Sequence, residues 1–133
     1  MTIELRYNDD KTITGWQTLE ELWISEPLRF DIADALYHFF PKAKSVHIEH
    51  VGTVGDPAHQ ARDSRHNDKP PAAIDIRWLD VVTGDGFKVR VDFTESLDNR
   101  WVAAKFWETQ DGAKAYHVDE ADKGHIHLQA VEA

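Results

Sequence analysis

Residues 72–93 have the sequence AAIDIRWLDVVTGDGFKVRVDF, and this stretch decides the fold. Apolar and polar side chains alternate on both sides of the central segment Thr83–Gly86. Alternation with a period of two predicts strands, and a short segment rich in Gly and Asp between two such strands predicts a hairpin turn. We therefore expect antiparallel strands at Ala72–Val82 and Phe87–Phe93.

Three further segments show the same alternation. They are Thr2–Tyr7, Ser45–Val51 and His125–Val131. Each has the apolar spacing of a half-buried strand, so we expect each to add to a sheet built around the hairpin.

Helical spacing occurs upstream of the hairpin. Between Thr18 and Phe40, apolar residues recur at intervals of three and four, and Pro27 interrupts the pattern. This spacing predicts a short helix followed by a longer one over Pro27–Phe40, with proline in its first turn. Ser96–Thr109 fits a helix about as well as a strand, and we expect a helix there. The pattern as a whole predicts an α+β domain with a small, mostly antiparallel sheet and two or three helices.

Length, charge and cysteine content narrow the classes of function. The chain has 133 residues, 41% of them hydrophobic, which suits one domain over residues 1–133. The net charge of −9 argues against nucleic acid or an anionic membrane surface as the main partner. Cysteine is absent, which excludes disulfides and thiolate metal sites. We expect no membrane insertion and no secretory signal, because Met1–Trp16 lacks a basic segment followed by an apolar run.

The segment Gly52–Pro71 contains glycines, prolines and many charges and is expected to be a loop. A loop of this length is unusual in a small domain and is typically either functional or disordered. It contains His66, which precedes Asp75 by nine positions, and also His59. We expect His59 to be a solvated surface residue. The loop is therefore the first place to look for chemistry.

Histidine and aspartate are suitable ligands for zinc. A catalytic Zn²⁺ requires three protein ligands drawn from His nitrogen and carboxylate oxygen, with a fourth position left for water. His66, Asp75 and His127 would supply such a set. Asp75 and His127 can face one metal if their strands pair, because neighbouring strands lie about 4.8 Å apart. His125 lies two positions from His127 and hence on the same face of the strand, within reach of a metal-bound water.

Three motifs of this chain resemble the zinc-site signature of the group that joins D-Ala-D-Ala and L-Ala-D-Glu metallopeptidases, lysostaphin-type endopeptidases and the hedgehog signalling domain. They are Ser64-x-His66, Ala73-x-Asp75-Ile76 and His125-x-His127. The resemblance covers roughly the second half of the chain, and the order helix then strand over 27–51 is also similar. It implies a Zn²⁺ cofactor held by His66, Asp75 and His127, and a peptidoglycan stem peptide as substrate. It also places the general base or the oxyanion stabiliser at His125.

The chain departs from this family pattern in two ways. The interval between His66 and Asp75 is longer than the family's usual one, and Gly124 stands where many of the peptidases have Glu or Asp. The carboxylate that moves the proton to the leaving amine is therefore expected to be Asp122 or Glu120, or to be missing. The family's substrate-steadying arginine corresponds to Arg62 or Arg65, and the sequence does not choose between the two.

These observations leave three functions open. The first is an endolysin-like, zinc-dependent peptidoglycan peptidase, made in the cytoplasm and acting on the cell wall if released. The second is a non-catalytic, zinc-stabilised interaction module, which Gly124 and the acidic charge favour. The third is an acidic inhibitor protein without a metal. The remaining histidines are expected to be structural or exposed, namely His38, His47, His50 and His117. The tryptophans are expected to complete the core or, in one case, to line a groove.

Overall fold

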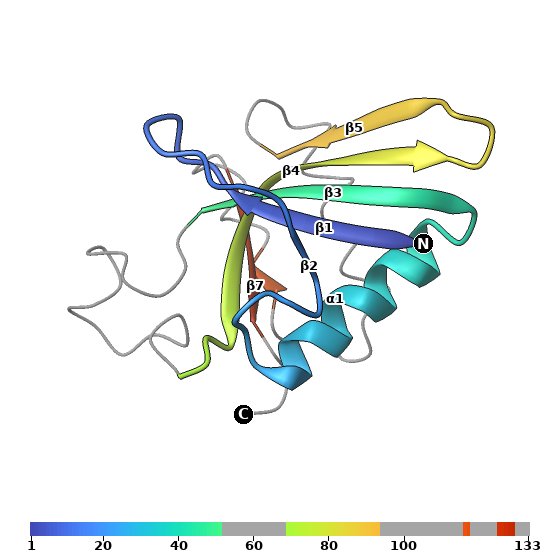
Figure 1. Cartoon of the computed structure of the whole chain (residues 1–133). Helices are drawn as coiled ribbons and strands as arrows, with labels where there is room; N and C mark the ends of the chain where they lie inside the picture. Colours follow the sequence, from blue (N-terminus) through green and yellow to red (C-terminus); the bar gives the residue numbers. More distant parts are fainter. Residues whose placement is uncertain (52–68, 94–115, 118–124, 130–133) are drawn as a thin grey trace.

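The computed structural model of the protein describes residues 1–51, 69–93, 116–117 and 125–129 (Figure 1). In chain order its elements are β1 Thr2–Tyr7, β2 Gln17–Thr18, α1 Glu26–Phe39, β3 Ala43–Val51, β4 Ala73–Thr83, β5 Lys88–Asp92, β6 Tyr116–His117 and β7 Ile126–Gln129. They form a sheet in the order β2-β1-β3-β4-β7-β6, and β5 also pairs with β4. β1 and β3 are parallel, whereas the other pairs are antiparallel.

The long strand β4 organises the sheet. Residues 75–83 of this strand pair with β3 along one edge, while its other edge is shared by β5 and β7. β5 pairs with the half that follows Arg77, and β7 pairs with the half that precedes it. The register with β3 shifts at this residue, because Glu49 pairs with Trp78 and the next residue of β3 pairs with Ile76. Such a β-bulge bends a strand, and Figure 1 shows β4 curving strongly along its length.

The residues at its two ends explain where helix α1 begins and ends. The side chain of Ser25 accepts a hydrogen bond from the backbone N–H of Leu28, and Pro27 occupies the first turn. Phe40 closes the helix, since the following Pro41 lacks the N–H that a further turn would need.

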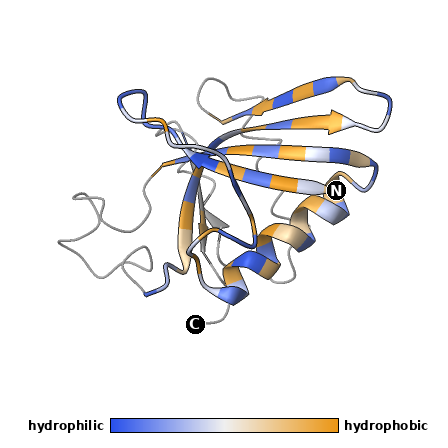
Figure 2. Ribbon diagram, viewed as in Figure 1, coloured by the Kyte–Doolittle hydropathy of each residue, from blue (hydrophilic) through white to orange (hydrophobic). Residues whose placement is uncertain are grey.

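The core lies between α1 and one face of the sheet. Leu28, Ile32, Ala35 and Leu36 of the helix are buried. The sheet meets them with fully buried side chains from successive strands, namely Leu5, Ile48, Leu79, Ile74, Ile76 and Leu128. In Figure 2 the strands alternate between hydrophobic and hydrophilic residues, as a sheet with one core-facing side requires. No helix in the described part of the chain has the length and apolar character needed to cross a membrane.

The described part of the chain is α+β, and the strands expected from alternation are present with small changes at their ends. The prediction of a short helix before Pro27 is wrong. Residues 19–22 form a single turn, held by the backbone N–H groups of Glu21 and Leu22 donating to the carbonyl of Thr18. The chain then extends, because the N–H of Ser25 donates to the carbonyl of Pro71 while its side chain caps α1. The helix expected at Ser96–Thr109 lies outside the described residues.

Candidate functional site

Asp75 lies on the sheet face that points away from α1. Its neighbours Ile74 and Ile76 are fully buried in the core, so alternation along β4 directs the carboxylate to the opposite face. Asp75 is nevertheless only 3% exposed. A buried carboxylate must be compensated by cations, hydrogen-bond donors or a metal ion, so this position has the character of a site.

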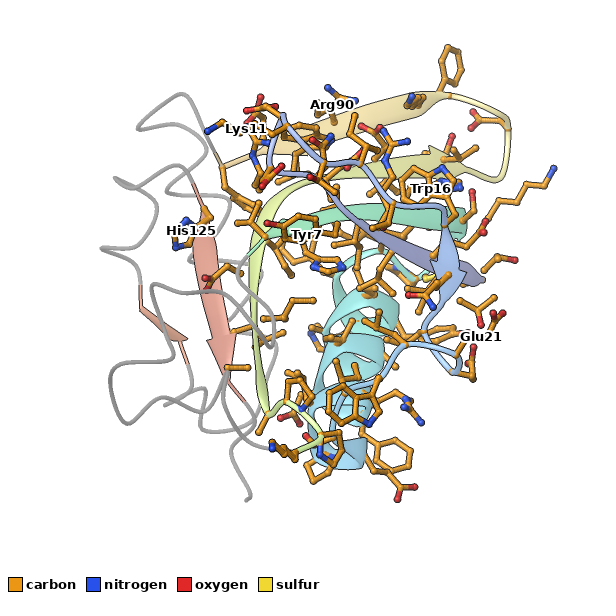
Figure 3. All side chains as sticks on the ribbon, turned by 60° about the vertical axis from the view of Figure 1, so that its left-hand side comes forward. Tyr7, Lys11, Trp16, Glu21, Arg90 and His125 are labelled. Atoms are coloured by element: carbon orange, nitrogen blue, oxygen red, sulfur yellow. The ribbon has the colours of Figure 1, made fainter. Side chains whose placement is uncertain are left out.

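His125 lies beside this carboxylate. Its Nε2 atom is 3.7 Å from Oδ2 of Asp75, and its side chain retains 21% exposure. Figure 3 shows His125 at the start of β7. The pairing of β7 with β4 therefore brings together a buried acid and a partly exposed imidazole that are far apart in the sequence.

The register places two further histidine positions in the same row. His127 of β7 is the Cα partner of Asp75, and His117 of β6 is the Cα partner of His127. On the other side of β4, Val51 of β3 is the partner of Asp75. Residues directly opposite in an antiparallel pair have Cβ atoms about 4.5–5.5 Å apart. One row of the sheet thus carries Asp75 and two histidine positions, of which His117 was not expected to be part of the site.

His50 is buried next to this row, on the core-facing side of the sheet. It is 4% exposed, and it is the Cα partner of Ile76. Burial lowers the pKa of His50 to about 4, although the negative charge of Asp75 opposes that shift. Its Nδ1 atom has no hydrogen-bond partner among the described residues. The alternation of Val46, Ile48 and His50 was the signal that could have predicted its burial.

Beyond Asp75, the same sheet face carries a buried acid and an indole. Glu49 and Trp78 are directly opposite on β3 and β4. The Oε1 atom of Glu49 accepts from Nε of Arg6 at 2.7 Å. Its Oε2 atom and the indole N–H of Trp78 have no hydrogen-bond partner among the described residues. Arg6 also lies over the ring of Trp16, 4.4 Å from its centroid.

The next row of this face holds a second ion pair. Arg90 of β5 donates from Nε and Nη2 to the two carboxylate oxygens of Asp80, at 2.8 and 2.9 Å. Burial alone would raise the pKa of Asp80, but the hydrogen bonds and positive charges of Arg90 and Lys88 outweigh it and lower the pKa. Polar and charged groups thus continue from Asp75 across the face that α1 leaves uncovered.

The donor types of the site suit zinc, although the described residues do not complete a set. An aspartate and histidines are common zinc ligands. Within the described ranges, no group of three or more His, Asp or Glu side chains is placed to hold a metal ion. The other residues that the sequence assigned to the site lie outside those ranges, namely His66, Glu120, Asp122, Arg62 and Arg65.

The three tryptophans in the described residues differ from expectation, and Trp101 and Trp107 lie outside those residues. Trp16 is 39% exposed and Trp23 is 57% exposed, so neither completes the core. Trp78 is half-buried on the face opposite the core.

Three comparisons were made for the whole chain, with protein-family models, with curated proteins and with solved structures, and each finds no match.

Proposed function

We propose that this protein is a zinc-dependent peptidase that cleaves a short peptide bond of peptidoglycan, of the D-Ala-D-Ala or L-Ala-D-Glu type. One observation carries the proposal. The buried carboxylate of Asp75 is the register partner of His127 and lies 3.7 Å from the imidazole of His125. A carboxylate opposite one histidine position and close to a second histidine is the kind of donor set from which catalytic zinc sites are built.

Each residue has a separate role in this proposal. His66, Asp75 and His127 would hold the ion. A bound zinc ion would polarise the scissile carbonyl of the substrate and would lower the pKa of a bound water to about 7. Asp75 is fixed in orientation by its position between buried isoleucines in the strand. His125 retains some exposure, so it can meet substrate and either orient the attacking water or donate a hydrogen bond to the developing oxyanion.

Two steps are assigned to residues that lie outside the described ranges. Asp122 or Glu120 would carry the proton to the leaving amine. Arg62 or Arg65 would bind the carboxylate of the stem peptide, since a guanidinium pairs well with a carboxylate. The substrate would approach the sheet face that α1 leaves uncovered.

The first test is the metal content of the purified protein, by elemental analysis without added metal. We expect about one equivalent of zinc in the wild type, with loss in Asp75→Asn and in His127→Ala. His38→Ala is the matched control, because His38 lies at an exposed position of α1. Circular dichroism verifies that each variant is folded. A wild type that takes up no zinc on reconstitution would contradict the proposal and leave an acidic inhibitor protein.

The second test is digestion of purified peptidoglycan, with release of free amino groups as the readout. We expect His125→Ala to keep its zinc and to lose the release of amino groups. Zinc without hydrolysis in the wild type would instead indicate the zinc-stabilised interaction module. The net charge of −9 favours that second candidate, because the cell wall is itself anionic.

A further inference from the structure

Helix α1 and the segment just before it carry three exposed aromatic side chains. Trp23, Phe30 and Tyr37 are 57%, 62% and 51% exposed. Phe30 and Tyr37 are two helical turns apart and share one side of α1, opposite the buried Leu28 and Ile32. Trp23 stands a further seven positions upstream, just before the helix cap. We call these three residues the aromatic ridge.

Two carboxylates flank the centre of the aromatic ridge. Glu26 and Asp34 lie one turn before and one turn after Phe30, and both are exposed. On a helix of 3.6 residues per turn they fall about 40° to either side of Phe30. Neither forms an ion pair with any residue in the described part of the chain. The ridge therefore presents flat aromatic rings with negative charges directly beside them.

We propose that the aromatic ridge, with Glu26 and Asp34, docks a basic amphipathic segment of another protein. Several exposed aromatic residues along one element indicate an interaction surface, because large aromatic side chains are more often buried in soluble proteins. A lysine or arginine of the partner would lie over a ring of the ridge and beside one of the carboxylates, which combines cation–π attraction with ion pairing. The chain already uses this contact internally, where Arg77 and Arg90 lie over the ring of Trp78.

The charges argue against the other occupants. An antiparallel pairing of two copies centred on Phe30 would bring Glu26 of one copy against Asp34 of the other. Each copy also has a net charge of −9, so the copies repel one another. The same carboxylates would be repelled by an anionic membrane. A basic protein segment is the occupant that both the rings and the charges of the ridge fit.

The ridge and the candidate zinc site lie on opposite sides of the sheet. α1 covers the core face, whereas Asp75 lies on the other face. A segment docked on the outer side of α1 would therefore not contact Asp75 or His125. The proposal therefore stands or fails independently of the peptidase proposal.

The test is a fluorescence anisotropy titration of the intact protein at physiological ionic strength. The probe is a labelled, helix-forming peptide made of Leu and Arg, and its counterpart has Glu in place of Arg. We expect saturable binding of the Leu/Arg peptide, weakened about tenfold by Phe30→Ser and by the double variant Glu26→Gln/Asp34→Asn. Phe87→Ser is the matched control, because Phe87 is 70% exposed on the β4–β5 hairpin, and it should bind like the wild type.

Four results would overturn the proposal. They are absence of saturable binding, equal binding of the Leu/Glu peptide, equal weakening by Phe87→Ser, and a dimer in sedimentation equilibrium that Phe30→Ser dissociates. The last would identify a second copy as the occupant. These variants replace exposed side chains only, so circular dichroism should show an unchanged fold.

Discussion

His50 and Asp75 lie at adjacent positions of the β3–β4 register, on opposite faces of the sheet, and they are electrostatically coupled. His50 is the partner of Ile76, and Asp75 is the partner of Val51. The carboxylate favours protonation of the imidazole, but burial outweighs it and lowers the pKa of His50 to about 4. The folded protein therefore holds His50 neutral at a pH where an unfolded chain would protonate it.

The stability of the fold should therefore fall as the medium is acidified. The unfolded state binds a proton at His50 near pH 6.5, whereas the folded state does so only near pH 4. The contribution is fully present above pH 6.5 and is lost as the pH falls towards 4, with a loss of about 3 kcal/mol. Urea unfolding between pH 7 and pH 4 measures it. His50→Gln should flatten this dependence, and an unchanged slope in that variant would refute the assignment.

The cap of α1 gives a second prediction. Ser25→Ala removes the side-chain acceptor for the N–H of Leu28 and should lower the free energy of unfolding by about 1 kcal/mol. Ser25→Asp supplies another good cap and should restore most of it. Thermal unfolding followed by circular dichroism compares the two variants. Equal stability of Ser25→Ala and wild type would show that the cap contributes nothing.

The pair of Asp80 and Arg90 gives a third prediction, testable with a double-mutant cycle. The variants are Asp80→Asn, Arg90→Gln and the combination of both. We expect a coupling energy of about 1 kcal/mol, which is modest because solvent screens a half-exposed arginine. The Arg90 side chain is 50% exposed and that of Asp80 is 11% exposed. The coupling should decrease in high salt, and a salt-independent value would contradict an electrostatic origin.

Zinc should stabilise the fold if the peptidase proposal holds. A ligand that binds only the native state, present at a hundred times its Kd, adds about 2.7 kcal/mol to the free energy of unfolding. Removal of metal with a chelator should therefore lower the Tm, and addition of zinc should restore it. Asp75→Asn should abolish this response while His38→Ala retains it. A zinc response that survives Asp75→Asn would place the metal elsewhere.

The regular part of the fold follows from local spacing, which is why the strands and α1 could be predicted. The failed helix before Pro27 shows the limit, because tertiary hydrogen bonding between Ser25 and Pro71 decided that segment. The sequence also carries a signal for the bulge. The core-facing apolar residues of β4 stand at even positions at Ile74 and Ile76 but at odd positions at Leu79 and Val81. The prediction treated the strand as one unbroken alternation and so missed the change.

The candidate site was predictable only in part. Asp75 and His127 were expected to meet if their strands paired, and the register places them opposite one another. The position of His117 opposite His127 depends on which strands become neighbours. Alternation within one strand carries no information about neighbours far away in the chain, so His117 could not be assigned to this row beforehand.

The bulge at Arg77 has a consequence for how this domain can vary. With one extra residue accommodated there, Leu79 and Ile76 both face the core and Asp75 emerges on the open side. Without the bulge, the residues before Leu79 would alternate regularly. With Leu79 still facing the core, Ile76 would then point to solvent and the carboxylate of Asp75 would point into the hydrophobic interior. The side of the sheet on which Asp75 lies is thus set by the number of residues between Asp75 and Leu79. Residue type matters at Arg77 as well, because its guanidinium donates to the backbone carbonyl of Asn8 and to both carboxylate oxygens of Asp10.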